Sequence, residues 1–462
     1  MTSRRTALLA ALMIAALGAS GCATLSRFNI FDRDKGPQET AGQGERISII
    51  PNNERLEVAE GLKGVDFSLP PAAAVADWPL PGGTPEQSVG HVDAAPNLSV
   101  AWRRGFGQGS DRGNHVTAPP VAAAGRVYVM DGEANVSAID ARSGQQVWRT
   151  SLRPADNRRD REAFGGGIAF SDGKLYVTSG YRLVAQLDAA TGAVGWTTRT
   201  EQPIHAAPTL AAGRVAAVAI DNTLLTFDVA TGAPAWTYQA LSEPARILSA
   251  SSPAVSGDTI IASFGSGELV ALRATNGNDL WNEALSRASR TSALSEIRDI
   301  PGRPVIYQGD VFAMSHSGVF AATDVRTGQA RWSLPVVGVT TPWPAGDVVF
   351  VVSKTGELIC AQRETGQIYW MRDLNEGFQG KRRGGLFGIG GTRVLRPIWS
   401  SPLLANERLI LVSSSGQLVS VNAKTGEVAK RMDLGAPALL APIAVGDTIY
   451  VATDTAQLIA LR

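Results

Sequence analysis

The sequence predicts an all-β protein, an eight-bladed β-propeller, from two series of repeats along the chain. In the first series a glycine recurs at a mean interval of 47 residues, from Gly144 to Gly426 in six intervals. In the second series a short turn precedes an alternating apolar strand, and this signal occurs eight times between residues 125 and 452. Such a period is typical of propeller blades, each of which is one small sheet.

The two series differ by one member, and this difference predicts how the ring closes. The last unit, which ends at residues 457–462, has no terminal tryptophan strand, whereas LSVAW at residues 98–102 is such a strand without the others. We expect the N-terminal strand to complete the last blade, because a closed ring leaves no unpaired sheet edge. The propeller then spans residues 97–462, with about 46 residues for each blade.

The N-terminus has the pattern of an export signal. Arg4 and Arg5 precede an uncharged apolar run at residues 7–17, which is shorter than the roughly 20 residues of a spanning helix. We therefore expect residues 1–21 to be a signal peptide. Residues 22–96 lack repeats and are rich in Pro, Gly and Ala, so we expect a tether and N-terminal extension whose end packs on the propeller.

The small residues after the apolar run end in a cysteine, and ASGC at residues 19–22 resembles a bacterial lipobox. This resemblance implies that Cys22 is acylated and becomes the mature N-terminus. Ala23 in the following position implies sorting to the outer membrane. The alternative is an ordinary signal peptide with a chance cysteine.

Recurring residues within the repeats have structural roles. Aspartates such as Asp140 and Asp188 can accept backbone N–H bonds across a tight turn, and the glycine four residues later tolerates a positive φ. Four residues after that glycine, a tryptophan on the last strand can pack between neighbouring blades. These docking tryptophans are Trp148, Trp196, Trp236, Trp281, Trp332 and Trp370, and Lys430 takes the seventh place.

Composition and motifs exclude several function classes. The formal net charge of +1 provides no general attraction for nucleic acid. The four histidines are scattered, and the chain has no P-loop, nucleophile elbow or Cys-x-x-Cys pair. We predict no metal site, no cofactor and no catalytic residue.

One segment departs from the repeat. The interval from Gly366 to Gly426 is 60 residues, and the excess falls in residues 375–396, where Lys381, Arg382 and Arg383 form a basic cluster. This segment is either a solvated loop or a secondary contact arm for an acidic or lipid-proximal partner.

The spacing A-x-D-x-x-T-G-x-x-x-W resembles the docking motif of pyrroloquinoline-quinone (PQQ) propellers over most of residues 98–462. Two families share it, the quinoprotein dehydrogenases and the BamB family of lipoproteins in the outer-membrane β-barrel assembly machinery. The dehydrogenase resemblance implies an adjacent Cys-Cys disulfide, a carboxylate base and a Ca²⁺ site. Cys360 is the only cysteine besides Cys22, so that disulfide is excluded. Length, anchor and compact blades resemble the BamB family instead.

The BamB resemblance implies a non-catalytic scaffold, lipid-anchored in the outer membrane and facing the periplasm. Its partners would be the BamA-type barrel subunit and the other lipoproteins of the complex, with unfolded outer-membrane proteins as clients and no nucleic acid. The contact with the barrel subunit is carried over to Arg246, Ile247, Leu248 and Asp299. Alternatives are that Ile247 and Leu248 merely enter a strand, and that the chain is a PQQ-dependent dehydrogenase or a periplasmic ligand-binding or sensor propeller.

Overall fold

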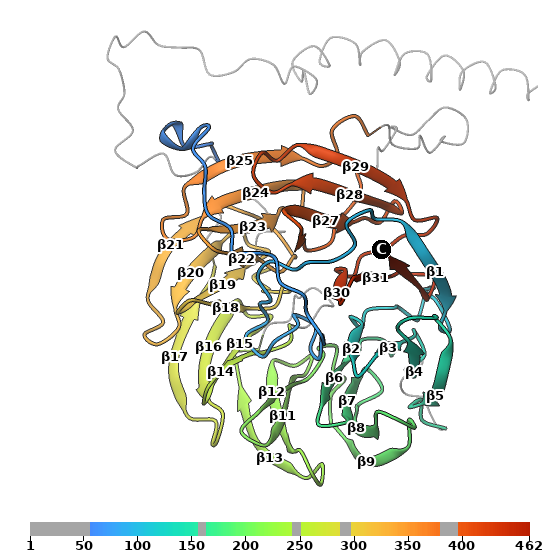
Figure 1. The fold of residues 1–462 in the computed structure, drawn as a ribbon. Coiled ribbons are helices and arrows are strands. Elements are labelled where there is room, and N and C mark those ends of the chain that lie inside the picture. Colours follow the sequence, from blue (N-terminus) through green and yellow to red (C-terminus); the bar gives the residue numbers. More distant parts are fainter. Residues whose placement is uncertain (1–55, 156–162, 243–250, 287–296, 379–395) are drawn as a thin grey trace, which may run out of the picture. The chain divides into compact units, whose positions relative to one another are not determined.

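Eight four-stranded antiparallel sheets form a ring in the computed structural model (Figure 1). The structure describes residues 56–155, 163–242, 251–286, 297–378 and 396–462. In the described part of the chain before the first strand lies a short 3₁₀ helix, η2 (Glu60–Leu62). No helix in these ranges has the length and apolar character needed to cross a membrane.

The first four blades follow the chain from the innermost to the outermost strand. Blade 1 contains β2 (Val121–Ala123), β3 (Arg126–Met130), β4 (Asn135–Asp140) and β5 (Gln146–Ser151). Blade 2 contains β6 (Gly166–Ser171), β7 (Lys174–Ser179), β8 (Leu183–Asp188) and β9 (Val194–Arg199). Blade 3 contains β10 (Thr209–Ala211), β11 (Arg214–Val218), β12 (Thr223–Asp228) and β13 (Pro234–Gln239). Blade 4 contains β14 (Ala254–Ser256), β15 (Thr259–Ser263), β16 (Glu268–Arg273) and β17 (Asp279–Ala284).

The remaining blades repeat this order, and the last one uses a strand from the N-terminal side. Blade 5 contains β18 (Val305–Tyr307), β19 (Asp310–Met314), β20 (Phe320–Asp324) and β21 (Ala330–Leu334). Blade 6 contains β22 (Trp343–Ala345), β23 (Val348–Val352), β24 (Glu357–Gln362) and β25 (Ile368–Asp373). Blade 7 contains β26 (Leu403–Ala405), β27 (Arg408–Val412), β28 (Gln417–Asn422) and β29 (Val428–Asp433). Blade 8 contains β30 (Ile443–Val445), β31 (Thr448–Ala452), β32 (Gln457–Leu461) and β1 (Val100–Gly105).

The ring closes as the sequence predicts. Strand β1 pairs antiparallel with β32, from Val100 opposite Leu461 to Gly105 opposite Gln457. The two ends of the propeller therefore belong to one sheet. Strand β1 supplies the fourth strand of blade 8 and pairs with the edge of β32 that would otherwise be open. The predicted eight-bladed propeller, closed by its N-terminal strand, is confirmed.

Burial explains the pattern of each strand. Second strands are buried at every position, as in β23 (VVFVV), or at every position but the first, as in β3, because each blade is covered on both faces by its neighbours. Outermost strands such as β9 alternate between exposed and half-buried residues, since only one face of the rim meets the next blade. The core is thus a series of apolar layers between blades.

A tight turn joins the last two strands of blade 2. Asp188 accepts backbone N–H bonds from Ala190 (3.1 Å) and Thr191 (3.0 Å), and Gly192 has a φ of +75°. The ammonium of Lys174 and the Thr191 bonds lower the pKa of Asp188 to about 2. The ionised carboxylate therefore holds the turn at neutral pH.

The six docking tryptophans connect blades 1 to 7 in succession. Trp196, for example, donates through Nε1 to the carbonyl oxygen of Val229 at 3.3 Å, and its ring covers Gly232. The other indoles make the same bond: Trp148 to Ala189, Trp236 to Ala274, Trp281 to Val325, Trp332 to Arg363 and Trp370 to Ala423. Two features require glycine at this turn: the backbone has a positive φ, and the indole ring leaves no room for a Cβ.

Candidate functional site

Residues 73–94, here called the crossing segment, run across the centre of the ring (Figure 1). The segment is anchored by Trp78, which is 1% exposed and forms a backbone bridge with Ala122 of β2. Hydrogen bonds join the segment to the inner strand, or the turn after it, in all eight blades. The contacts, in blade order, are Trp78–Ala122, Pro79–Phe170, Gln87–Thr209, Pro85–Val255, Glu86–Ile306, Gly90–Trp343, Val92–Leu404 and Val75–Gly446.

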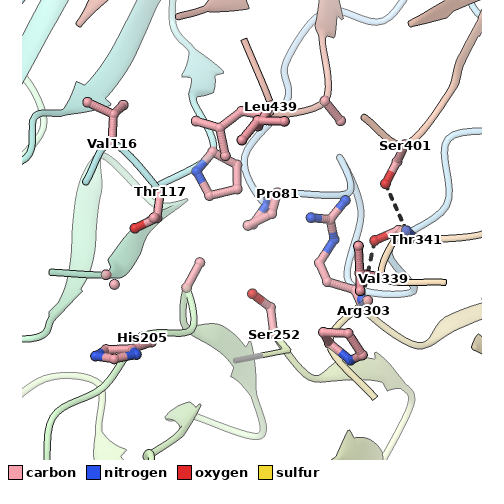
Figure 2. A pocket seen from close by; sticks show the side chains of 18 of the residues that line it. Pro81, Val116, Thr117, His205, Ser252, Arg303, Val339, Thr341, Ser401 and Leu439 are labelled. Atoms are coloured by element: carbon pink, nitrogen blue, oxygen red, sulfur yellow. Dashed lines mark hydrogen bonds between the residues drawn. The ribbon is translucent and has the colours of Figure 1, made fainter. Parts of the chain in front are cut away.

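Above the crossing segment lies a cavity of about 290 Å³, here called the cup. It is lined by the chain just before the innermost strand of each blade, so all eight inter-blade connections contribute to it. Pro81 of the crossing segment also lines the cup (Figure 2). The crossing segment bonds the inner strands and the turns that follow them. The cup lies on the opposite side, where the inter-blade connections enter the inner strands, and it opens on that face of the ring.

The walls of the cup are mainly apolar, with a few hydroxyl groups. Phe164 stacks on His205, with ring centroids 4.7 Å apart. On the other side the Thr341 hydroxyl accepts a bond from the backbone N–H of Arg303 at 3.2 Å, and the Thr341 N–H donates to Ser401 Oγ at 2.7 Å. These bonds fix the connections around the cup.

Among the described residues that line the cup, Arg303 alone is charged at every physiological pH. Its guanidinium extends into the cup (Figure 2), and loss of hydration lowers its pKa to about 10. Among the described residues that line the cup none is acidic, and Arg303 Nε has no hydrogen-bond partner among the described residues. The cup is therefore a positive site with apolar walls.

Sequence reasoning did not single out Arg303, although a signal was present. Seven inner strands begin just after an X-Pro pair, and X lines the cup in each. The seven residues are Pro119, Ala207, Ser252, Arg303, Thr341, Ser401 and Ala441. An alignment of the repeats reveals this departure. Arg303 is a long cation at a position where six other blades have a small or uncharged residue.

Most site residues expected from the sequence lie outside the described residues. These are Cys22, Arg246, Ile247, Leu248, Lys381, Arg382 and Arg383. Asp299 is described and is 3% exposed, and its carbonyl oxygen accepts the N–H of His316 at 2.8 Å. Its side chain is therefore enclosed in the connection between β17 and β18, four residues before Arg303.

The strand order gives the connection of the chain to which each of these expected residues belongs. Residues 246–248 belong to the connection between β13 and β14, Asp299 to that between β17 and β18, and residues 381–383 to that between β25 and β26. All three are inter-blade connections of the kind whose ends line the cup.

Solved structures resemble this one in fold. The crystal structure of BamB from Moraxella catarrhalis gives a TM-score of 0.66 at 17% identity, covering 79% of this chain and 99% of that chain. A quinohemoprotein alcohol dehydrogenase from Comamonas testosteroni gives 0.63 at 15% identity, covering 84% of this chain and 81% of that chain. At these identities the likeness shows only the propeller fold.

The described residues do not fit the calcium and quinone centre of a quinoprotein dehydrogenase. Calcium takes carboxylate and other oxygen ligands, yet no described residue lining the cup is acidic, and the described ranges hold no group of three or more His, Cys, Asp or Glu. Cys360 is buried in β24, where burial raises the pKa of its thiol, so it is an inert core residue.

The sequence comparisons identify the family. The relative in Escherichia coli (strain K12) is 24% identical over 331 residues, 71% of this chain and 79% of its own, and that in Moranella endobia is 22% identical over 339 residues, 73% and 82%. Both are named outer membrane protein assembly factor BamB. The model of that family matches residues 86–161, 132–372 and 389–462. Because these matches include nearly the whole propeller, the chain belongs to the outer membrane protein assembly factor BamB family.

Proposed function

We propose that the chain is a non-catalytic scaffold for the assembly of outer-membrane β-barrel proteins. The observation that carries the proposal is the family match over nearly the whole propeller, in a chain whose described residues do not fit the calcium and quinone centre of its dehydrogenase neighbours. A rigid ring suits a scaffold, because it presents many connections on one face while the blades hold them in place.

The proposed partner is the BamA-type barrel subunit, beside the other lipoproteins of the complex and with unfolded barrel proteins as clients. We assign its contact to Arg246, Ile247 and Leu248, where an apolar anchor beside a cation has the composition of an interface hot spot. In this proposal Asp299 supports the neighbouring connection from within, since its side chain is enclosed. The basic residues 381–383 would form a secondary contact.

The proposed location is the outer membrane, on the periplasmic side, with acylated Cys22 as the anchor. Each buried CH₂ of an acyl chain contributes about 0.8 kcal/mol, so several chains hold the protein without a spanning helix. Replacing Cys22 with Ser should move the protein from the outer-membrane fraction to the soluble periplasmic fraction. Retention of the variant in the membrane, in cells lacking its partners, would refute acylation as the anchor.

The partner proposal is tested by crosslinking and affinity purification from solubilised envelopes. The wild-type chain should copurify a large β-barrel protein, identified by mass spectrometry. The double variant Arg246→Ala and Leu248→Ala should lose it, because removing a hot-spot anchor commonly costs about 2 kcal/mol, roughly thirtyfold in affinity. The control changes Lys381, Arg382 and Arg383 to Ala and should retain the barrel protein.

The two ways in which this test fails are distinct. If the wild-type chain copurifies no barrel protein, the proposed function is wrong. If the control variant loses the partner and the double variant keeps it, the function stands and the contact belongs to the basic segment.

A further inference from the structure

We propose that the cup is a binding site for a carboxylate group, held by the guanidinium of Arg303. The proposal concerns the central cavity of the ring and does not depend on the assembly role. Its ligand is either a free organic acid or the C-terminal carboxylate of a peptide, because both present the same charged group on an apolar body.

The repeat makes Arg303 exceptional. Seven connections place the residue before a proline on the wall of the cup, and the other six of these residues are Pro, Ala, Ser or Thr. If the residue at this position had only to fill space at the centre of the ring, such uncharged residues would be sufficient, and they bring no charge into the cup. The arginine has therefore been placed where packing and closure of the propeller do not require it.

The charge of Arg303 is not used within the described protein. Elsewhere in blades 5 and 6, Arg331 contacts Asp310 and Asp324, and Arg363 contacts Asp310, as surface and inter-blade arginines of the ring commonly do. Arg303 has no ion pair among the described residues, and its Nε has no hydrogen-bond acceptor there. A desolvated cation without a counter-charge destabilises a fold, so its presence favours a role in binding.

The geometry selects the class of ligand. One planar guanidinium suits a carboxylate, which it can hold with two parallel hydrogen bonds, and a single cation does not neutralise a dianionic phosphate. Val116, Phe164 and Leu439 offer an apolar wall, and the hydroxyl group of Ser252 faces the same space (Figure 2). The volume of about 290 Å³ admits a ligand the size of a capped amino acid.

Calorimetric titration of the purified, unacylated chain tests this site. The probes are N-acetylleucine, its amide, and one leucine-terminated hexapeptide with a free or an amidated C-terminus. Both free acids, or one of them, should bind, and the amides should bind at least about tenfold more weakly, because a charge-assisted bond is lost. Tighter binding of the peptide acid indicates a peptide ligand, and binding of N-acetylleucine alone indicates a small organic acid.

Matched arginine variants locate the binding. Arg303→Gln should weaken the acid at least about tenfold. Arg112→Gln should not, because Arg112 is an exposed residue in the β1–β2 connection that does not line the cup. Folding is checked by thermal melting, in which Arg303→Gln should melt at or above the wild-type temperature because an unpaired, half-buried charge has been removed.

Three binding results would overturn the proposal. They are no binding of either acid at millimolar concentration, equal binding of acids and amides, and unchanged affinity in Arg303→Gln. A melting temperature well below that of the wild type would show that Arg303 is needed for the fold, which contradicts the reading of it as a binding residue.

Discussion

Two glycines of blade 3 allow the docking of one blade on the next to be measured. Gly213 and Gly232 both have a φ of +71°, so an alanine at either position is strained by the same backbone conformation. A Cβ on Gly213 would meet no atom within 4 Å, whereas a Cβ on Gly232 would lie 2.5 Å from Cδ2 of Trp196. The difference between the two alanine variants therefore reports the contact between the indole and the glycine.

The structure sets the size of this difference. Each alanine should cost about 1 kcal/mol from the left-handed conformation, and this shared cost cancels. At Gly232 the indole must also move, which breaks its bond to the Val229 carbonyl oxygen and part of its packing. A lost hydrogen bond costs about 1 kcal/mol and lost aromatic contact a similar amount, so Gly232→Ala should be less stable than Gly213→Ala by about 2 kcal/mol.

Urea denaturation followed by circular dichroism measures both variants. The control repeats both alanine variants in a Trp196→Leu background, in which the indole ring is absent. There Gly232→Ala should cost no more free energy of unfolding than Gly213→Ala. Equal midpoints for the two single variants in the wild-type background would show that the indole does not stabilise the joint between blades 2 and 3.

Two further predictions concern the crossing segment and the turns. Trp78→Ala should lower the free energy of unfolding by about 3–5 kcal/mol in urea, because a fully buried ring that stacks on Trp343 is removed; a loss below 1 kcal/mol would mean that the segment is a loose attachment. Asp188 should titrate near pH 2 by NMR, and Lys174→Met should move its pKa up towards 3.8, because Lys174 is the largest cause of the shift. Since the folded pKa is the lower one, this stabilisation is complete above pH 3.8 and is lost as the pH falls towards 2, and a Lys174→Met variant with an unchanged titration would refute this cause.

The blades could be predicted because every blade repeats the same physical requirement. A single four-stranded sheet cannot bury both faces alone, so each unit repeats the apolar strands, and most units also repeat the turn aspartate and the docking tryptophan. The turn glycine occurs seven times at similar intervals, so the pattern is distinguishable from a chance one. The expectation that Asp140 and Asp188 bond across their turns follows from local geometry, and both carboxylates accept N–H bonds there.

The path of residues 73–94 could not be predicted, because its contacts are single and not repeated. Many are made by backbone carbonyl oxygens, such as those of Pro79 and Glu86, which leave no mark in the sequence. His91 is equally hidden: its Nδ1 bonds the Pro70 carbonyl oxygen at 2.7 Å, and its Nε2 accepts the N–H of Glu407 at 2.8 Å. In the sequence His91 is an isolated histidine, because Glu407 comes beside it only when the ring has formed.

The exceptions to the repeat follow from the way the ring closes. Blade 8 joins β32 to β1 without a hairpin, so it has no turn glycine on which a tryptophan from blade 7 could lie. Lys430 stands in that place, and its Nζ donates to the carbonyl oxygens of Asn97 at 2.9 Å and Leu98 at 3.3 Å. Trp102 of β1 lies over Gly144 of blade 1 as the other docking rings lie over their glycines, but its Nε1 has no hydrogen-bond partner among the described residues. The one docking position without tryptophan thus marks the joint where the two ends of the propeller meet, and there a cation bonded to main-chain carbonyls replaces the ring.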